Sequence, residues 1–254
     1  MIDRDEFFIG YAPPLPAGLA RFVGRIVTGL AFAVVAWAAV LASGHVPLEG
    51  GTFEFGHLQR FAGTIVGRPY PALRLDETDR SVPALLLVAP GKHGADDLVH
   101  GLDGHHVALT GTRIRRGRLA MIEIEPTSLV SETVTEPVEN LAGHDEDGAV
   151  TSVRVRGEVV DSKCFLGVMV PGSGKTHKDC ASLCLRGGVP PALFAHDRAG
   201  DSALMLLAGL SGDKIGARAL QIAGEAVEMT GMLQRQGGWL VLRTDPGDWR
   251  TVVR

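Results

Sequence analysis

One stretch of the chain occurs twice, and this repeat limits the fold more than any other feature. Residues 104–124 read GHHVALTGTRIRRGRLAMIEI, and residues 224–244 read GEAVEMTGMLQRQGGWLVLRT. Both alternate apolar and polar residues on either side of a glycine turn, which is the pattern of two strands joined as a hairpin. At a shift of 120, six identities align: Gly104/Gly224, Val107/Val227, Thr110/Thr230, Gly111/Gly231, Arg115/Arg235 and Gly117/Gly237.

Shorter matches extend the repeat upstream. GTIV at 63–66 matches GEVV at 157–160 with a shift of 94, and ALLLVA at 84–89 matches ALMLLA at 203–208 with a shift of 119. Because the shift grows between these two matches, the second copy has gained about 26 residues there, which predicts an insert at 161–194. A chance match of generic strand residues is the other explanation.

Composition indicates a mainly β chain. There are 33 glycines and only 6% aromatic residues, which favours turn-rich β structure over a helical bundle. The unit of strands with a late glycine hairpin is typical of a small barrel of the oligonucleotide/oligosaccharide-binding (OB) type, and a small sandwich is the alternative. We therefore expect two tandem OB-like barrels at 55–130 and 153–254, joined by an acidic linker at 131–152, with a Cys/His-bearing helical insert in the second.

An apolar run lies near the N-terminus. Residues 26–43 contain no charge, and with their flanks they predict a membrane-spanning helix at 21–44. Arg21 and Arg25 precede the run, so residues 1–20 are expected to form a cytoplasmic tail of an inner-membrane protein whose remaining residues are periplasmic. A cleaved signal peptide or a buried core helix are the alternatives.

The insert carries most of the residues capable of chemistry. Thr176 and Asp179 resemble a capping box, and the glycines and prolines after Arg186 stop a helix, which predicts a helix at 177–186. On that helix, His177, Cys180 and Cys184 are spaced three and four apart and share one face. Cys164 follows the preceding strand.

These four side chains predict a metal site. A set of Cys164, His177, Cys180 and Cys184 suits tetrahedral zinc, and its sulfur content also suits cuprous ion or iron, including haem iron. Met169, also in the insert, is a candidate thioether ligand for copper. Lys175 and Asp161 lie near these residues in the sequence and are candidate cofactor-binding residues.

Other interpretations of the cysteines remain open. An exported Cys164 is able to form a disulfide with Cys180 or Cys184, which would staple a structural interaction module. Alternatively, Cys180 in the first helical turn is a nucleophilic thiol with Cys164 or Cys184 as its resolving partner, as in a redox enzyme or switch. Simple packing of small buried residues is the third possibility.

Several function classes find no support. GSGKT at 172–176 resembles the end of a phosphate-binding loop, but the position that needs the first glycine is Met169, so no nucleotide is expected. The net charge of −4 argues against a nucleic-acid partner. No catalytic motif is present, which favours an accessory protein: an assembly factor or subunit of a membrane redox complex that handles a metal or cofactor.

An anchor followed by small exported barrels resembles the layout of the membrane-tethered haem chaperones of cytochrome c maturation. That family carries a histidine after the last strands of its barrel, whereas this chain ends DPGDWRTVVR. The haem-binding residue is therefore not transferred to this chain.

Overall fold

The computed structural model describes residues 16–44, 50–76, 84–131, 149–196 and 202–252. The chain divides into two compact units, Met1–Leu48 and Glu49–Arg254. Most of the predicted tail and most of the predicted acidic linker lie outside the described residues.

The first unit contains one long helix, α1 (Ala17–Gly44). It begins directly after Pro16, a position where proline is compatible with a helix, and the Pro16 carbonyl accepts a hydrogen bond from the Ala20 amide at 2.9 Å. The predicted apolar helix is therefore confirmed, with an earlier start. The length and composition of α1 fit a membrane-spanning helix and also an N-terminal signal sequence.

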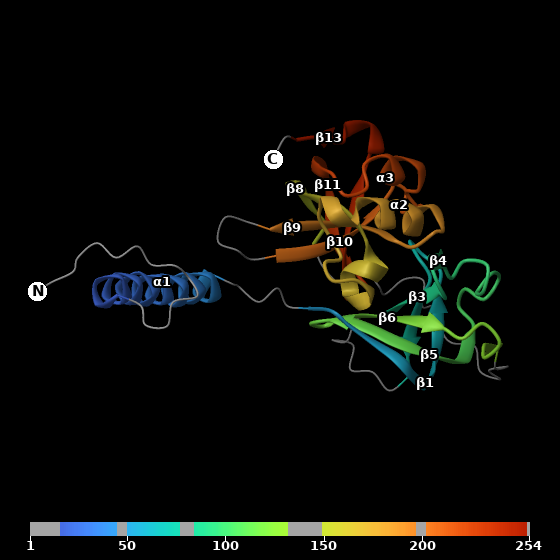
Figure 1. The fold of residues 1–254 in the computed structure, drawn as a ribbon. Coiled ribbons are helices and arrows are strands. Elements are labelled where there is room, and N and C mark those ends of the chain that lie inside the picture. The colour runs from blue at the N-terminus through green and yellow to red at the C-terminus, as the bar shows by residue number, and fades with distance from the viewer. Residues whose placement is uncertain (1–15, 45–49, 77–83, 132–148, 197–201, 253–254) are drawn as a thin grey trace, which may run out of the picture. The chain divides into compact units, whose positions relative to one another are not determined.

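The second unit begins with a sheet whose strands close into a ring (Figure 1). Its five ring strands pair in the order β1-β2-β3-β6-β5, and β5 pairs with β1 to complete a closed five-stranded β-barrel. These strands are β1 (Thr52–Val66), β2 (Ala72–Leu75), β3 (Leu85–Ala89), β5 (His106–Arg116) and β6 (Leu119–Ile124). Two short strands pair outside the ring, β4 (His93–Gly94) with β3 and β7 (Val130–Ser131) with β5.

A second sheet repeats this order of pairing. Its strands pair in the order β8-β9-β10-β12-β11, and β11 also pairs with β8. They are β8 (Thr151–Asp161), β9 (Pro191–His196), β10 (Ser202–Ala208), β11 (Ala226–Gln236), β12 (Trp239–Thr244) and the short β13 (Arg250–Thr251). A helix α3 (Ala217–Gln221) and a 3₁₀ turn η4 (Pro246–Asp248) complete it. Both predicted hairpins are confirmed, as β5–β6 and β11–β12.

Glycines stand where two backbones approach closely. A Cβ on Gly63 of β1 would lie 2.0 Å from the carbonyl oxygen of Arg74, and one on Gly157 of β8 would lie 2.5 Å from that of Phe194. Both distances are far inside van der Waals contact. Each of these strands therefore requires glycine at this point, which explains why both GTIV and GEVV begin with one.

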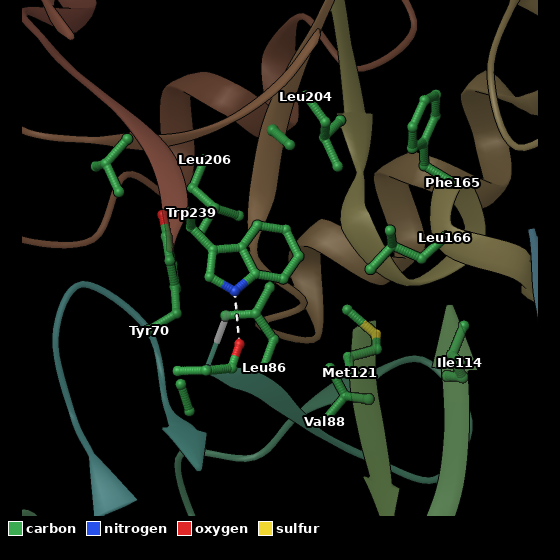
Figure 2. Close-up of a cluster of buried hydrophobic side chains, with 14 of the residues drawn as sticks. Tyr70, Leu86, Val88, Ile114, Met121, Phe165, Leu166, Leu204, Leu206 and Trp239 are labelled. Carbon is green, nitrogen blue, oxygen red and sulfur yellow. Dashed lines mark hydrogen bonds between the residues drawn. The ribbon is translucent and has the colours of Figure 1, made fainter. Parts of the chain in front are cut away.

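The apolar strand β3 is buried on both faces. Leu85 and Leu87 pack inside the first ring, while Leu86 and Val88 pack in a cluster between the two sheets. This intersheet cluster contains Tyr70, Leu86, Val88, Ile114, Met121, Phe165, Leu166, Leu204, Leu206 and Trp239, as Figure 2 shows. Burial on both faces is the reason why ALLLVA is a continuous apolar run rather than an alternating one.

Hydrogen bonds fix the two sheets at this cluster. The indole Nε1 of Trp239 donates to the carbonyl oxygen of Ala84 at 2.7 Å (Figure 2). The hydroxyl of Tyr70 donates to the carbonyl oxygen of Leu207 at 2.7 Å and accepts from the Ile215 amide at 3.3 Å. Burial raises the pKa of Tyr70. The buried polar groups are thus paired across the two sheets, which gives the cluster a defined geometry as well as apolar contact.

Candidate metal centre

The candidate site lies in the connection between β8 and β9, residues 162–190. One π-helical turn, η2 (Cys164–Val168), follows β8 directly, and a 3₁₀ turn η3 (Lys175–His177) leads into the helix α2 (Lys178–Arg186). The predicted helix is thereby confirmed from Lys178 to Arg186, whereas His177, its expected first residue, belongs to η3. Gly187 and Gly188 end it, since the Gly187 amide bonds the Leu183 carbonyl and Gly188 adopts a positive φ of 89°.

The predicted capping box is wrong. Thr176 lies inside η3 and is exposed, and the N-cap position of α2 is taken by His177 with no side-chain capping hydrogen bond. The cause is the 3₁₀ turn at Lys175–His177, because of which α2 begins at Lys178 and its N-cap is His177 instead of Thr176. In the glycine loop that precedes it, the Gly174 amide donates to the carboxylate of Glu158.

The three cysteine sulfurs converge. The Sγ atom of Cys164 lies 3.9 Å from that of Cys180 and 3.9 Å from that of Cys184. All three sulfurs lie within 4.8 Å of one another, and all three cysteines are free thiols. Cys164 and Cys184 are buried, at 3% and 1% exposure, whereas Cys180 is half-buried. Sulfur atoms from two separate elements therefore form one compact triangle.

His177 and Asp161 form a second group beside this triangle. The Nε2 atom of His177 lies 2.9 Å from Oδ2 of Asp161, and the other carboxylate oxygen accepts from the Cys164 amide at 2.8 Å. Both side chains are buried, Asp161 completely. The potential ligand atoms of Asp161, Cys164 and His177 lie within 4.8 Å of one another.

The four predicted metal ligands therefore do not form a single group. Cys164 belongs to both groups, whereas the group of Cys180 and Cys184 with Cys164 does not include His177. The reason is that His177 ends η3, before α2, and its imidazole turns to the buried Asp161. Asp161 is placed by these contacts to orient His177, whereas Lys175 is exposed at the start of η3.

A lysine from the first sheet reaches the triangle, although no sequence pattern relates it to the cysteines. The Nζ atom of Lys92, in the turn between β3 and β4, donates to Sγ of Cys180 at 2.8 Å. The two residues are 88 positions apart in the chain, so no local spacing relates them. A positive charge at this distance stabilises a thiolate or a metal-bound sulfur.

The turn that carries Lys92 is held by the connection itself. Lys163, only 1% exposed, donates from Nζ to the carbonyl oxygens of Ala89 and Gly91, at 2.8 and 2.6 Å. The same Nζ lies 2.5 Å from the Glu123 carboxylate. In addition, the Gly94 amide donates to the carbonyl oxygen of Gly187 at 2.9 Å. Three hydrogen bonds thus fix the turn against both ends of the connection, and the ion pair with Glu123 holds Lys163 itself.

The two buried thiols have opposite pKa shifts. The hydrogen bond with Cys184, followed by burial, raises the pKa of Cys164. The same hydrogen bond lowers the pKa of Cys184 against the effect of burial, and the charge of Lys92 contributes in the same direction. The hydrogen bond between the two sulfurs therefore favours the thiolate of Cys184 over that of Cys164. A soft metal ion requires such ionised sulfur.

Comparisons of this chain with protein-family models, with curated proteins and with solved structures gave no match.

Proposed function

We propose that this protein binds one soft metal ion through Cys164, Cys180 and Cys184. The observation that carries the proposal is the triangle of sulfur atoms, with two sides of 3.9 Å. In a tetrahedral zinc site with Zn–S bonds of about 2.3 Å, two sulfur ligands lie about 3.8 Å apart. The spacing therefore fits one face of a tetrahedron with little movement of the side chains.

Sulfur ligands define the class of metal. Thiolates favour zinc and cuprous ion over magnesium or calcium, which take oxygen ligands. Lys92 adds to this preference, because three thiolates carry three negative charges and one ammonium group cancels one of them. A divalent ion such as zinc then offsets the other two thiolate charges, which is favourable for a centre with two buried sulfurs.

His177 is the fourth ligand in this proposal. Its Nε2 atom is engaged with Asp161, so Nδ1 is the nitrogen left for a metal. A carboxylate that accepts from the other ring nitrogen is the usual second partner of a metal-bound histidine. The buried Asp161 therefore orients His177. A small rotation of the imidazole towards the sulfur triangle would complete a Cys₃His site.

The triangle also argues against thiol chemistry alone as the role of all three cysteines. Transfer of a disulfide among three cysteines requires a thiolate to attack a disulfide sulfur in line with the departing sulfur. Three atoms within 4.8 Å of one another, two pairs of them 3.9 Å apart, lie far from a straight line. The arrangement matches a shared ion better than a chain of exchange steps.

We further propose that the two sheets are tandem OB-like copies, of which the second bears the metal. Support comes from strand register, because equivalent residues face equivalent partners in both sheets. The matched pairs are Gly63–Val107 with Gly157–Val227, Gly63–Leu75 with Gly157–Ala195, and Leu86–Met121 with Leu206–Val241. The first strands are related by a shift of 94 and the later strands by a shift of 120, which is one more than the shift of 119 that aligns residues 84–89 with 203–208 in the sequence.

The cellular role follows from the anchor and from the absence of a catalytic motif in the sequence. With α1 in the inner membrane and Arg21 and Arg25 on the cytoplasmic side, Glu49–Arg254 would face the periplasm. A membrane-tethered thiolate site suits an assembly factor or a subunit of a membrane redox complex. Its partner is then another membrane protein that receives the metal or the metallo-cofactor.

Metal content tests the proposal. Full-length protein purified in detergent under anaerobic, reducing conditions is expected to contain about one zinc or copper ion per chain, measured by elemental analysis. Cys164→Ser removes the sulfur shared by both groups and is expected to abolish stoichiometric binding. Val170→Ala, in the same connection but 76% exposed, is the matched control and should retain the ion. Protein that takes up no zinc, copper or iron even after incubation with each ion would refute the site.

A further inference from the structure

We propose that the metal-free site has a second activity, thiol–disulfide exchange, in which Cys180 is the nucleophile and Cys164 the resolving thiol. The substrate class is an accessible disulfide. This activity does not depend on the metal proposal, since it uses the reduced, unoccupied cysteines. Metal and disulfide would occupy the same sulfur atoms and therefore exclude each other.

The solvent exposure of the three sulfurs identifies Cys180 as the nucleophile. Cys180 is half-buried, whereas Cys164 and Cys184 are 3% and 1% exposed, so an incoming disulfide meets Cys180 first. The ammonium group of Lys92 lies 2.8 Å from Sγ of Cys180 and so places a positive charge beside the exposed sulfur. The three hydrogen bonds that fix the turn of Lys92 keep this charge in place.

Position selects the resolving thiol. Cys164 lies on η2, a different element from α2, and its sulfur is 3.9 Å from Cys180. Cys184 lies on the same helix as Cys180, one turn further on, where the two side chains run side by side rather than towards each other. Cys164 approaches from the buried side, so the second half of the substrate departs on the opposite, solvent side.

Two steps complete the exchange. The Cys180 thiolate attacks one sulfur of a disulfide R–S–S–R, which forms Cys180–S–S–R and releases one thiolate R–S⁻. The Cys164 thiol then loses its proton to solvent and attacks Sγ of Cys180, which forms the Cys164–Cys180 disulfide and releases the second R–S⁻. Together the two cysteines lose two electrons and the one proton of Cys164, and the substrate disulfide becomes two thiolates.

Mass spectrometry with oxidised glutathione as the probe tests the order of events. Reduced, metal-free full-length protein in detergent is expected to form a Cys164–Cys180 disulfide without retaining glutathione. Cys164→Ser should stop at a stable glutathione adduct on Cys180, and Cys180→Ser should react at least tenfold more slowly. A first adduct on Cys184, or a wild-type protein that keeps glutathione on Cys180, would overturn the proposal.

Variants of Lys92 test the role of the positive charge beside Sγ of Cys180. Lys92→Met is expected to slow the first step about tenfold, the effect of one unit charge at hydrogen-bond distance in water, and Lys92→Arg should restore most of the rate. Lys178→Met is the control, because Lys178 lies on α2 beside Cys180 in the sequence but pairs with Glu225. A Lys92→Met rate equal to that of wild type would contradict the assignment. Elemental analysis of the same variants keeps this result separate from the metal proposal.

Discussion

The two sheets differ most in the connection after their first strand. In the first sheet, residues 67–71 lead from β1 to β2, whereas in the second sheet residues 162–190 lead from β8 to β9 and contain η2, η3 and α2. Position 67 is a glycine whose amide bonds Asp103, and the position with the matching shift is the buried Asp161. The same order of strands therefore serves as plain scaffold in one case and as the base of a thiol site in the other.

The comparison also shows that the first sheet is more than a spacer. Its turn between β3 and β4 brings Lys92 to Cys180, and that turn is held by Lys163 from the second sheet. The long connection thus supplies the sulfur atoms, and the first sheet supplies the charge beside them. The site consequently depends on both sheets being packed together through the intersheet cluster.

The largest effect is expected from Lys163→Met. This change leaves the Glu123 carboxylate and two backbone carbonyls without their buried partner, and breaking a buried ion pair typically costs about 3–5 kcal/mol of unfolding free energy. Chemical denaturation measures this loss. Lys178→Met, which removes a partly exposed pair, should cost at most about 1 kcal/mol. Equal costs would show that Lys163 does not join the two sheets.

Asp161→Asn tests the difference between positions 161 and 67 directly. Loss of the carboxylate behind His177 is expected to weaken metal binding by about 10- to 100-fold, as for other second partners of metal-bound histidines. Competition with a chromophoric chelator measures the affinity. Asp103→Asn, which alters the first connection instead, should leave the affinity unchanged. Unchanged binding in Asp161→Asn would exclude His177 as a ligand oriented by Asp161.

The smallest effect is expected at the glycines that both sheets have in their first strand, Gly63 and Gly157. Gly63→Ala and Gly157→Ala each place a methyl group against a backbone carbonyl and should each cost about 1–3 kcal/mol of unfolding free energy. Gly216→Ala is the control, because its Cβ would meet no atom within 4 Å. Thermal unfolding measures all three. A large difference between the Gly63 and Gly157 variants would contradict the equivalence of β1 and β8.

Local sequence patterns predicted the strands, the hairpins and α2. Alternation and glycine turns are properties of neighbouring residues, so they identify β5–β6 and β11–β12 directly. The change in the repeat shift between the matched segments predicted the long connection between β8 and β9. The helical spacing of Cys180 and Cys184 predicted that both lie on one side of α2, and this side contacts Cys164.

The remaining features depend on contacts between distant segments. Lys92 lies in an ordinary glycine turn, and its position beside Cys180 follows only from the packing of the two sheets. The orientation of His177 depends on the 3₁₀ turn, which the resemblance to a capping box concealed. One available signal was missed, because the unbroken apolar run in β3 already indicated a strand buried on both faces.

X-ray absorption at the metal edge tests the central claim most directly. In full-length protein loaded with one equivalent of zinc under reducing conditions, we predict three sulfur ligands at about 2.3 Å and one nitrogen ligand at about 2.0 Å. A first shell that contains only nitrogen and oxygen, unchanged when Cys164 is replaced by serine, would contradict the claim that the three cysteines form a metal centre.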